Sequence, residues 1–201
     1  LQAELGDGTP VYVGMRHWHP FVADAVKDAV AGGARELVGL PLAPQFSTVS
    51  VARYADALRE AAPAGVAVRC VASWHDHPGL IAAFAEKLRG AGPADVVLFT
   101  AHSLPVRLIE SGDPYAREVE RTAALVAEAA GLTSYERAFQ SAGRTPEPWI
   151  GPSVEEALRS VHARGARSVL AAPIGFVSDH TEILFDLDVQ AAREAERLGI
   201  A

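Results

Sequence analysis

Short apolar runs of strand length alternate with amphipathic stretches of helical length along the whole chain, and this alternation constrains the fold more than any other feature. The predicted strands cover residues 11–15, 37–40, 66–72, 96–100, 137–139 and 169–174. The predicted helices cover residues 20–31, 51–61, 78–90, 115–130, 153–164 and 182–198. Connections rich in Gly and Pro join them, and these suit right-handed crossovers between parallel strands. The sequence therefore predicts an α/β fold with parallel sheets flanked by helices.

The chain is long enough for one large domain or two small ones. Its 201 residues are 49% hydrophobic and 21% charged, which is typical of globular protein. A candidate boundary between two α/β halves lies at residues 61–68, which contain Pro63 and Gly65. We therefore predict an N-terminal half over residues 1–65 and a second half over residues 66–201. A capping box formed by Ser153 and Glu156 marks the start of the fifth predicted helix.

Charge and cysteine content exclude several classes of partner. The formal net charge is −7 and no basic block interrupts it, so nucleic acid and anionic membrane surfaces would be repelled. No apolar run approaches the roughly 20 residues of a membrane helix, and the first residues do not resemble a signal peptide. The only cysteine, Cys70, cannot form an internal disulfide or hold an iron–sulfur cluster alone. We expect a soluble, cytoplasmic protein.

Polar side chains follow two of the most apolar predicted strands. His102 comes directly after residues 96–100, and the run Ser178-Asp179-His180-Thr181-Glu182 follows residues 169–174. Open α/β sheets present their chemistry at the carboxyl ends of strands, so both segments are expected to face one site. Each group also has an ordinary structural explanation. An imidazole can cap a helix, and a carboxylate in a first helical turn is favoured by the helix dipole.

Three further polar features are ambiguous on position alone. Asp186 lies four residues after Glu182 in an apolar setting, so both carboxylates would share one helix face and could serve a metal or proton route. Residues 74–78, with the sequence WHDHP, could bind a metal, although a helix N-cap at Asp76 or His77 is the favoured interpretation. Residues 16–20, with the sequence RHWHP, suit a flat aromatic anion or a simple helix start.

Six blocks of residues, in order and in register, resemble the ferrochelatase family over essentially the whole chain. They are GMRHWHP at 14–20, LPLAPQFST at 40–48, FTAHSLP at 99–105, GDPY at 112–115, PWIGP at 148–152 and PIGFVSDHTE at 173–182. The sequence of residues 42–48 is most similar to that of the bacterial ferrochelatases that use coproporphyrin. The resemblance implies two Rossmann-like, chelatase-type domains with a cleft for the tetrapyrrole.

The resemblance also implies a reaction and its residues. Ferrochelatases insert Fe²⁺ into a porphyrin, coproporphyrin III or protoporphyrin IX, in haem biosynthesis, and the ring must release two pyrrole protons. By similarity, His102 and Glu182 are both catalytic and metal-handling, with the division of their roles left open. Neutral imidazole is a suitable base and Fe²⁺ ligand near pH 7, and the carboxylate offers a hard oxygen.

The resemblance also implies supporting roles for eight more residues. Residues expected to contact the porphyrin are Arg16, His17, Tyr54, Trp149 and Phe176. Residues expected to orient the central pair are Asp179, His180 and Asp186, with a purely structural His180 as the alternative. No tightly bound cofactor is expected. Porphyrin and ferrous iron are expected as substrates, with transient protein partners of the haem pathway.

The sequence departs from the family pattern in two respects. The family's line of acidic residues meets Gln190 here, which shortens a carboxylate relay. The chain opens at what looks like the end of a helix and stops after a helix where a further strand is expected, so we expect a fragment lacking elements at both ends. A [2Fe–2S] cluster is not supported by the residues present.

Two other functions remain open from the sequence. A cobalt chelatase acting on sirohydrochlorin would have a similar plan. A non-catalytic tetrapyrrole or haem carrier could use the same cleft, but it would not need both His102 and Glu182.

Overall fold

A computed structural model describes residues 1–6 and 8–201, which form two compact units. The first unit comprises Leu1–Pro41 and Ser47–Ser73, and the second comprises Leu42–Phe46 and Trp74–Ala201. The predicted division after residue 65 lies earlier in the chain than the passage from Ser73 to Trp74. The short segment 42–46 belongs to the second unit although both its neighbours along the chain belong to the first.

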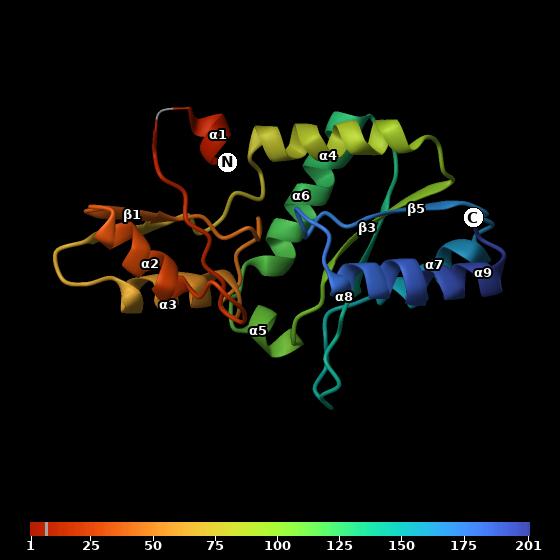
Figure 1. The fold of residues 1–201 in the computed structure, drawn as a ribbon. Coiled ribbons are helices and arrows are strands. Elements are labelled where there is room, and N and C mark those ends of the chain that lie inside the picture. The colour runs from red at the N-terminus through yellow and green to blue at the C-terminus, as the bar shows by residue number, and fades with distance from the viewer. Residues whose placement is uncertain (7) are drawn as a thin grey trace. The chain divides into compact units, whose positions relative to one another are not determined.

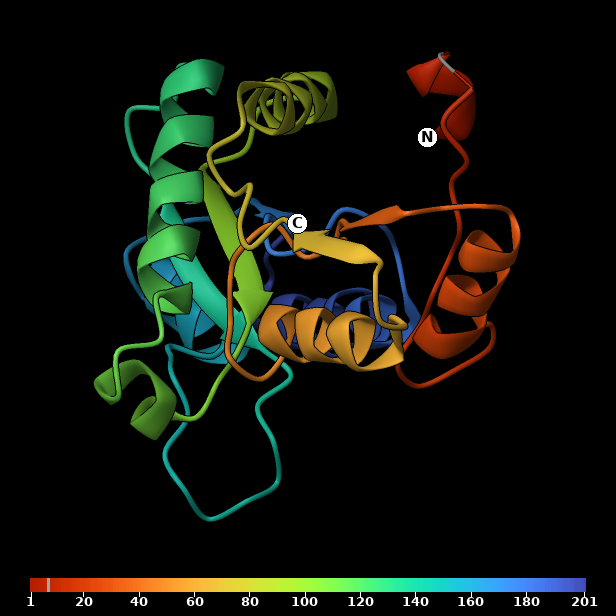
Figure 2. The same cartoon turned by 90° about the vertical axis from the view of Figure 1, so that its left-hand side faces the viewer.

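The first unit is a pair of parallel strands with two helices against it. It contains α1 (Gln2–Leu5), α2 (Val22–Ala31), β1 (Glu36–Gly39), α3 (Val51–Ala61) and β2 (Ala67–Cys70). The strands β1 and β2 are in register from Glu36 opposite Ala67 to Gly39 opposite Cys70. Both α2 and α3 lie on one side of this pair (Figures 1 and 2). A Cβ at Gly39 would lie 2.6 Å from Leu58 Cδ2, so glycine allows α3 to approach β1 closely.

The prediction of a strand at residues 11–15 is wrong. The structure has only an isolated bridge there, between Met15 and Phe21, closed by Met15 N donating to the Pro20 carbonyl and Val22 N donating to the Met15 carbonyl. These bonds hold the RHWHP segment as a tight loop in front of α2. The apolar side chains Tyr12 and Val13 remain exposed instead of entering a sheet.

The second unit is a three-layer α/β structure (Figure 1). Its sheet has the order β4-β3-β5, with β3 (Val96–His102) parallel to both β4 (Glu136–Gln140) and β5 (Val169–Ala172). The helices α4 (Pro78–Ala91) and α6 (Tyr115–Ala130) pack on one face, where Phe99 and Ala101 enter a large apolar cluster. The helices α7 (Val154–Ala163) and α9 (Ala192–Leu198) cover the other face around Leu98. The predicted α/β class is confirmed.

Local capping signals explain where several helices begin. Ser153 Oγ accepts from Glu156 N at 3.2 Å while Glu156 Oε2 accepts from Ser153 N at 2.8 Å, so the predicted capping box is confirmed. His77 caps α4, because its Nδ1 accepts from Gly79 N at 3.2 Å. The N-cap interpretation of residues 74–78 is therefore confirmed.

Two helical segments differ from the sequence prediction. A short helix α5 (Val106–Glu110) follows Pro105 and was not predicted. The single helix predicted at residues 182–198 consists of α8 (Thr181–Leu184), a π-helical segment η1 (Phe185–Ala191) and α9. Within the described residues, no helix has the length and apolar character that crossing a membrane would require.

Candidate active site

The imidazole of His102 stands at the carboxyl end of the central strand of the second unit. His102 is paired with Gln140 of β4, and the next residue, Ser103, donates its backbone N–H to the Gln140 carbonyl at 2.7 Å. Below it on the same strand, the Thr100 hydroxyl donates to Gln140 Oε1 at 2.9 Å. These contacts fix the end of β3 against β4. His102 is therefore held by a rigid part of the sheet.

A tyrosine from the GDPY motif supports the backbone of His102 from the other side. Tyr115 is buried, which raises the pKa of its phenol, and the neighbouring backbone of His102 acts on this pKa in the opposite direction. Asp113 Oδ1 accepts from Tyr115 N at 3.0 Å, which places the tyrosine at the start of α6. Sequence reasoning used this motif for the family resemblance but missed its support of His102.

Glu182 reaches the site on the segment that follows β5. Gly175 N donates to the Thr100 carbonyl at 3.3 Å, and a Cβ at Gly175 would lie 3.0 Å from Ala101 Cα. This close approach, which glycine permits, carries the chain across the end of β3. The segment then enters α8, where Glu182 Oε2 lies 3.6 Å from His102 Nδ1. The side chains of His102 and Glu182 are 34% and 50% exposed, so both face solvent and can meet a ligand.

Burial keeps His102 in its neutral form. The pKa of His102 is lowered, mainly because burial disfavours the imidazolium ion and further because of the neighbouring His180. The negative charges of Glu182 and Asp186 act in the opposite direction and offset part of this effect. At neutral pH the imidazole can therefore accept a proton or donate a lone pair to a metal ion.

Of the three predicted orienting residues, Asp186 and His180 lie close enough to His102 to act on its pKa. Asp186 lies on η1, where its Oδ2 accepts a hydrogen bond from Ser141 Oγ, and its charge acts on His102. His180 contacts Phe176 edge to face, with 5.1 Å between the ring centroids. Asp179 is exposed in the same loop. Ser141 is a contact that sequence reasoning missed.

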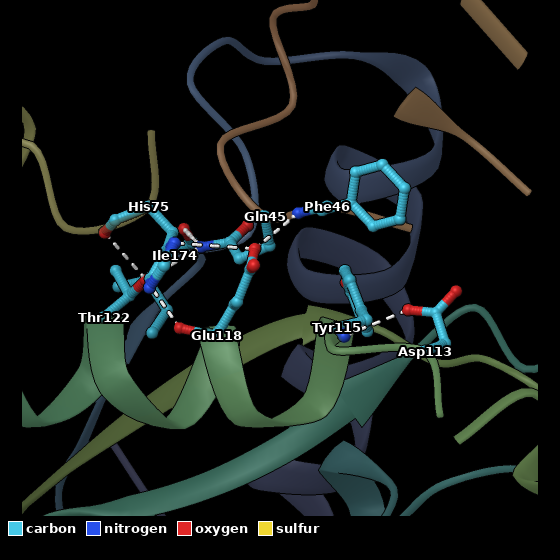
Figure 3. A network of polar contacts seen from close by, with 8 residues as sticks. All are labelled: Gln45, Phe46, His75, Asp113, Tyr115, Glu118, Thr122 and Ile174. Carbon is cyan, nitrogen blue, oxygen red and sulfur yellow. Dashed lines mark hydrogen bonds and ion pairs between the residues drawn. The ribbon is translucent and has the colours of Figure 1, made fainter. Parts of the chain in front are cut away.

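A buried polar network anchors the start of the segment that carries Glu182 (Figure 3). The Gln45 side chain is 2% exposed, and its Nε2 donates to Thr122 Oγ1 at 3.1 Å and to the Ile174 carbonyl at 3.3 Å. Thr122 Oγ1 also lies 3.0 Å from the His75 carbonyl oxygen. Residues 42–46, the turn before α4, the helix α6 and Ile174 are thus joined through a few polar atoms.

A carboxylate on α6 completes this network. Glu118 Oε2 accepts from Phe46 N at 2.6 Å and lies 3.4 Å from His75 Nδ1, and both side chains are mostly buried. His75 therefore contacts the Glu118 carboxylate, and His77 is a helix cap. No group of three His, Cys, Asp or Glu side chains that could hold a metal ion occurs among residues 1–6 and 8–201.

The remaining predicted porphyrin contacts fall in both units. In the first unit the Arg16 guanidinium lies over the Tyr54 ring, 5.3 Å from its centroid, and His17 is exposed in the same loop. In the second unit the Trp149 indole packs on Gly143, where a Cβ would lie 2.3 Å from the ring, and its Nε1 donates to Thr145 Oγ1 at 3.0 Å. Trp149 therefore shapes the loop that follows β4.

The fold and site define an α/β protein that presents an imidazole and a carboxylate together at the carboxyl end of a parallel sheet. Residues 1–201 match the ferrochelatase family model. Similar proteins include a ferrochelatase of Deinococcus radiodurans, 42% identical over 98% of this chain and 67% of its own. A ferrochelatase of Thermus thermophilus is 42% identical over 94% of this chain and 63% of its own. A coproporphyrin III ferrochelatase of Geobacillus thermodenitrificans is 38% identical over the same shares.

The chain belongs to the ferrochelatase family. It spans about two thirds of the length of the curated relatives it matches.

Proposed function

We propose that the protein containing this chain inserts Fe²⁺ into a porphyrin in haem biosynthesis, with coproporphyrin III as the favoured ring. The proposal is supported by the family and by relatives that are named coproporphyrin III ferrochelatase. The single observation that carries it is the 3.6 Å approach of Glu182 Oε2 to His102 Nδ1 at an accessible strand end.

The chemistry needs both kinds of group. A free porphyrin carries two pyrrole protons, and both must leave as the dication takes their place at the ring nitrogens. Neutral His102 can accept a proton, and the Glu182 carboxylate attracts the ion and offers an oxygen ligand. One imidazole nitrogen and one carboxylate leave most coordination positions of the ion open, which suits a metal that is passed on as substrate. The two protons leave one after the other, and either group can take each of them and release it to solvent, because both side chains are exposed in part.

Porphyrin binding is assigned to five residues. The Arg16 cation can pair with a propionate, and Tyr54 keeps its guanidinium in place by stacking. His17, Trp149 and Phe176 complete the proposed contacts. Asp179, His180 and Asp186 are proposed to orient the central pair.

The surrounding biology follows from composition and family. We place the protein in the cytoplasm, because its composition is acidic and contains a single cysteine. Ferrous iron and porphyrin are its substrates in this proposal, and transient haem-pathway proteins are its partners. No tightly bound cofactor and no [2Fe–2S] cluster is assigned to these residues.

The test is an absorbance assay of metal insertion with the complete protein. Wild type is expected to metallate coproporphyrin III with Fe²⁺ faster than protoporphyrin IX. His102→Ala is expected to lower kcat by about 100-fold or more, since general acid–base groups contribute at least that much. His162→Ala, a histidine on α7 whose Nδ1 lies 3.5 Å from Arg167 Nη1, is the matched control and should keep the wild-type rate.

Three outcomes would contradict the proposal. Co²⁺ insertion into sirohydrochlorin in place of iron insertion would identify a cobalt chelatase. Tight binding of porphyrin or haem without turnover would identify a carrier. A His102→Ala variant as fast as wild type would refute a role for His102 in the reaction.

A further inference from the structure

The carboxyl end of β4 is fixed directly beside His102. Gln140 is the register partner of His102, and its carbonyl and its side-chain oxygen accept from Ser103 N and Thr100 Oγ1. The Gln140 side chain is 5% exposed, so these bonds are formed in the core. The residue that follows, Ser141, therefore has a defined position relative to the imidazole.

Ser141 has an unusual backbone conformation at this point. Its φ is +60°, and no other residue except glycine has a positive φ in the part of the chain that the structure describes. Left-handed backbone is unfavourable for serine and persists only where the surroundings impose it. Such conformations cluster at functional sites, where they aim a side chain.

In this conformation the side chain of Ser141 contacts the helical segment that carries Glu182 and Asp186. Ser141 Oγ donates a hydrogen bond to Asp186 Oδ2, and both residues are partly buried. Asp186 lies four residues after Glu182 on the continuous helical path from α8 into η1. From this position the charge of Asp186 acts on His102.

Besides apolar packing, two polar contacts of the described residues join this helical segment to the end of the sheet. One is between Glu182 and His102, and the other is between Asp186 and Ser141. The first is 3.6 Å long and exposed, which is beyond ordinary hydrogen-bond length, so it cannot by itself hold Glu182 in one place. The second is a hydrogen bond, is partly buried and starts beside a strand end that is itself hydrogen-bonded to β3.

We propose that Ser141 is a positioning residue, which holds the Asp186 carboxylate and so keeps Glu182 within reach of His102. The inference rests on the proposed metal insertion. Ser141 touches neither member of the central pair in the contacts described above, and it acts through the helix that carries Glu182. Its loss should affect the metal steps and leave porphyrin binding nearly unchanged.

Ser141→Gly is the informative variant, because glycine accepts a φ of +60° without strain but lacks the hydroxyl. We expect kcat/KM for Fe²⁺ to fall about tenfold, while the KM for coproporphyrin III changes by less than twofold. The midpoint of thermal unfolding should stay the same or rise. If Ser141 contributed only to stability, the loss of activity would instead follow a loss of stability, and the unfolding midpoint would fall.

Rescue and control variants separate the hydroxyl from the backbone. Ser141→Asn should recover most of the loss, since asparagine tolerates the left-handed region and its amide can donate to Asp186. Ser168→Ala is the matched control, because Ser168 Oγ accepts from Asp95 N at 2.9 Å beside the amino end of β5. In an Asp186→Asn background, Ser141→Gly should have little further effect, as expected for residues that act in one contact.

Zn²⁺ affinity, measured by titration calorimetry, gives a readout that does not depend on turnover. We expect Ser141→Gly to bind Zn²⁺ about tenfold more weakly than wild type. Unchanged Zn²⁺ affinity, or additive effects of Ser141→Gly and Asp186→Asn, would overturn the inference. A wild type that inserts no metal into any porphyrin would refute the proposed function instead, and the Zn²⁺ titration would still decide the role of Ser141.

Discussion

Replacing Gln45 by methionine would measure how strongly the buried network holds the segment that leads to Glu182. Methionine has a similar length but cannot donate a hydrogen bond. The change removes the bonds from Gln45 Nε2 to Thr122 Oγ1 and to the Ile174 carbonyl. Thr122 Oγ1 keeps the carbonyls of His75 and Glu118 at 3.0 Å and 2.9 Å, so its hydroxyl still has partners.

The expected cost is therefore that of one carbonyl left without this donor. An unsatisfied buried polar group costs about 1–3 kcal/mol, and the burial of an apolar methionine side chain offsets a little of this. We expect the free energy of unfolding of the second unit to fall by about 2 kcal/mol. In a protein of this size, that change lowers the unfolding midpoint by about 4–8 °C.

Hydrogen exchange of peptides from β3 and α6 is the suitable assay, because it reports on the second unit alone. Gln2→Met is the matched control, since the Gln2 Oε1 bond to Val11 N is exposed. It should change stability by less than about 0.5 kcal/mol. A Gln45→Met variant that loses no more stability than Gln2→Met would refute the reasoning.

Four further results are expected. In Gly175→Ala the new Cβ would lie 3.0 Å from Ala101 Cα, so the chain should move away from Ala101. We expect a clear fall in the rate of metal insertion and only a small fall in the unfolding midpoint. An unchanged rate would contradict the close approach. Burial lowers the pKa of His102, so the acid limb of the rate against pH should lie below the ordinary value of about 6.5. Asp186→Asn removes a charge that favours the imidazolium ion, so this limb should move to lower pH, and a shift upward would contradict the assignment of His102 as base. Tyr115→Phe should cost about 1 kcal/mol in urea unfolding, because it removes the interaction of a buried hydroxyl with the His102 backbone. A neutral change would show that this interaction is not needed.

The regular elements could be predicted because their signals are local. The helices α3 and α6 have the boundaries that apolar periodicity predicts, and five predicted strands match β1 to β5. The run at residues 11–15 has the same composition as a strand but finds no partner strand, because Met15 pairs with the nearby Phe21. Periodicity could not predict η1 either, since one extra residue per turn barely changes the apolar pattern over a short segment.

The two central residues of the site could be predicted from the sequence, but the residues that support them could not. His102 and Glu182 follow apolar strands of a parallel sheet, so topology alone predicts that they lie at the same edge. Ser141, Gln45 and Tyr115 carry no such signal. Ser141 and Gln45 act through hydrogen bonds to residues far along the chain, and all three residue types are common in ordinary loops and helices. Such contacts depend on the final packing and can be identified only from the structure.

The interleaved course of the chain has a consequence for how the second unit can be made. During synthesis, residues 42–46 leave the ribosome well before the strands and helices that receive them. A truncated protein starting at Trp74 would expose Thr122 and the Ile174 carbonyl where Gln45 normally docks. An excised second unit would therefore need this pentapeptide added back, either as a separate ligand or through an artificial tether.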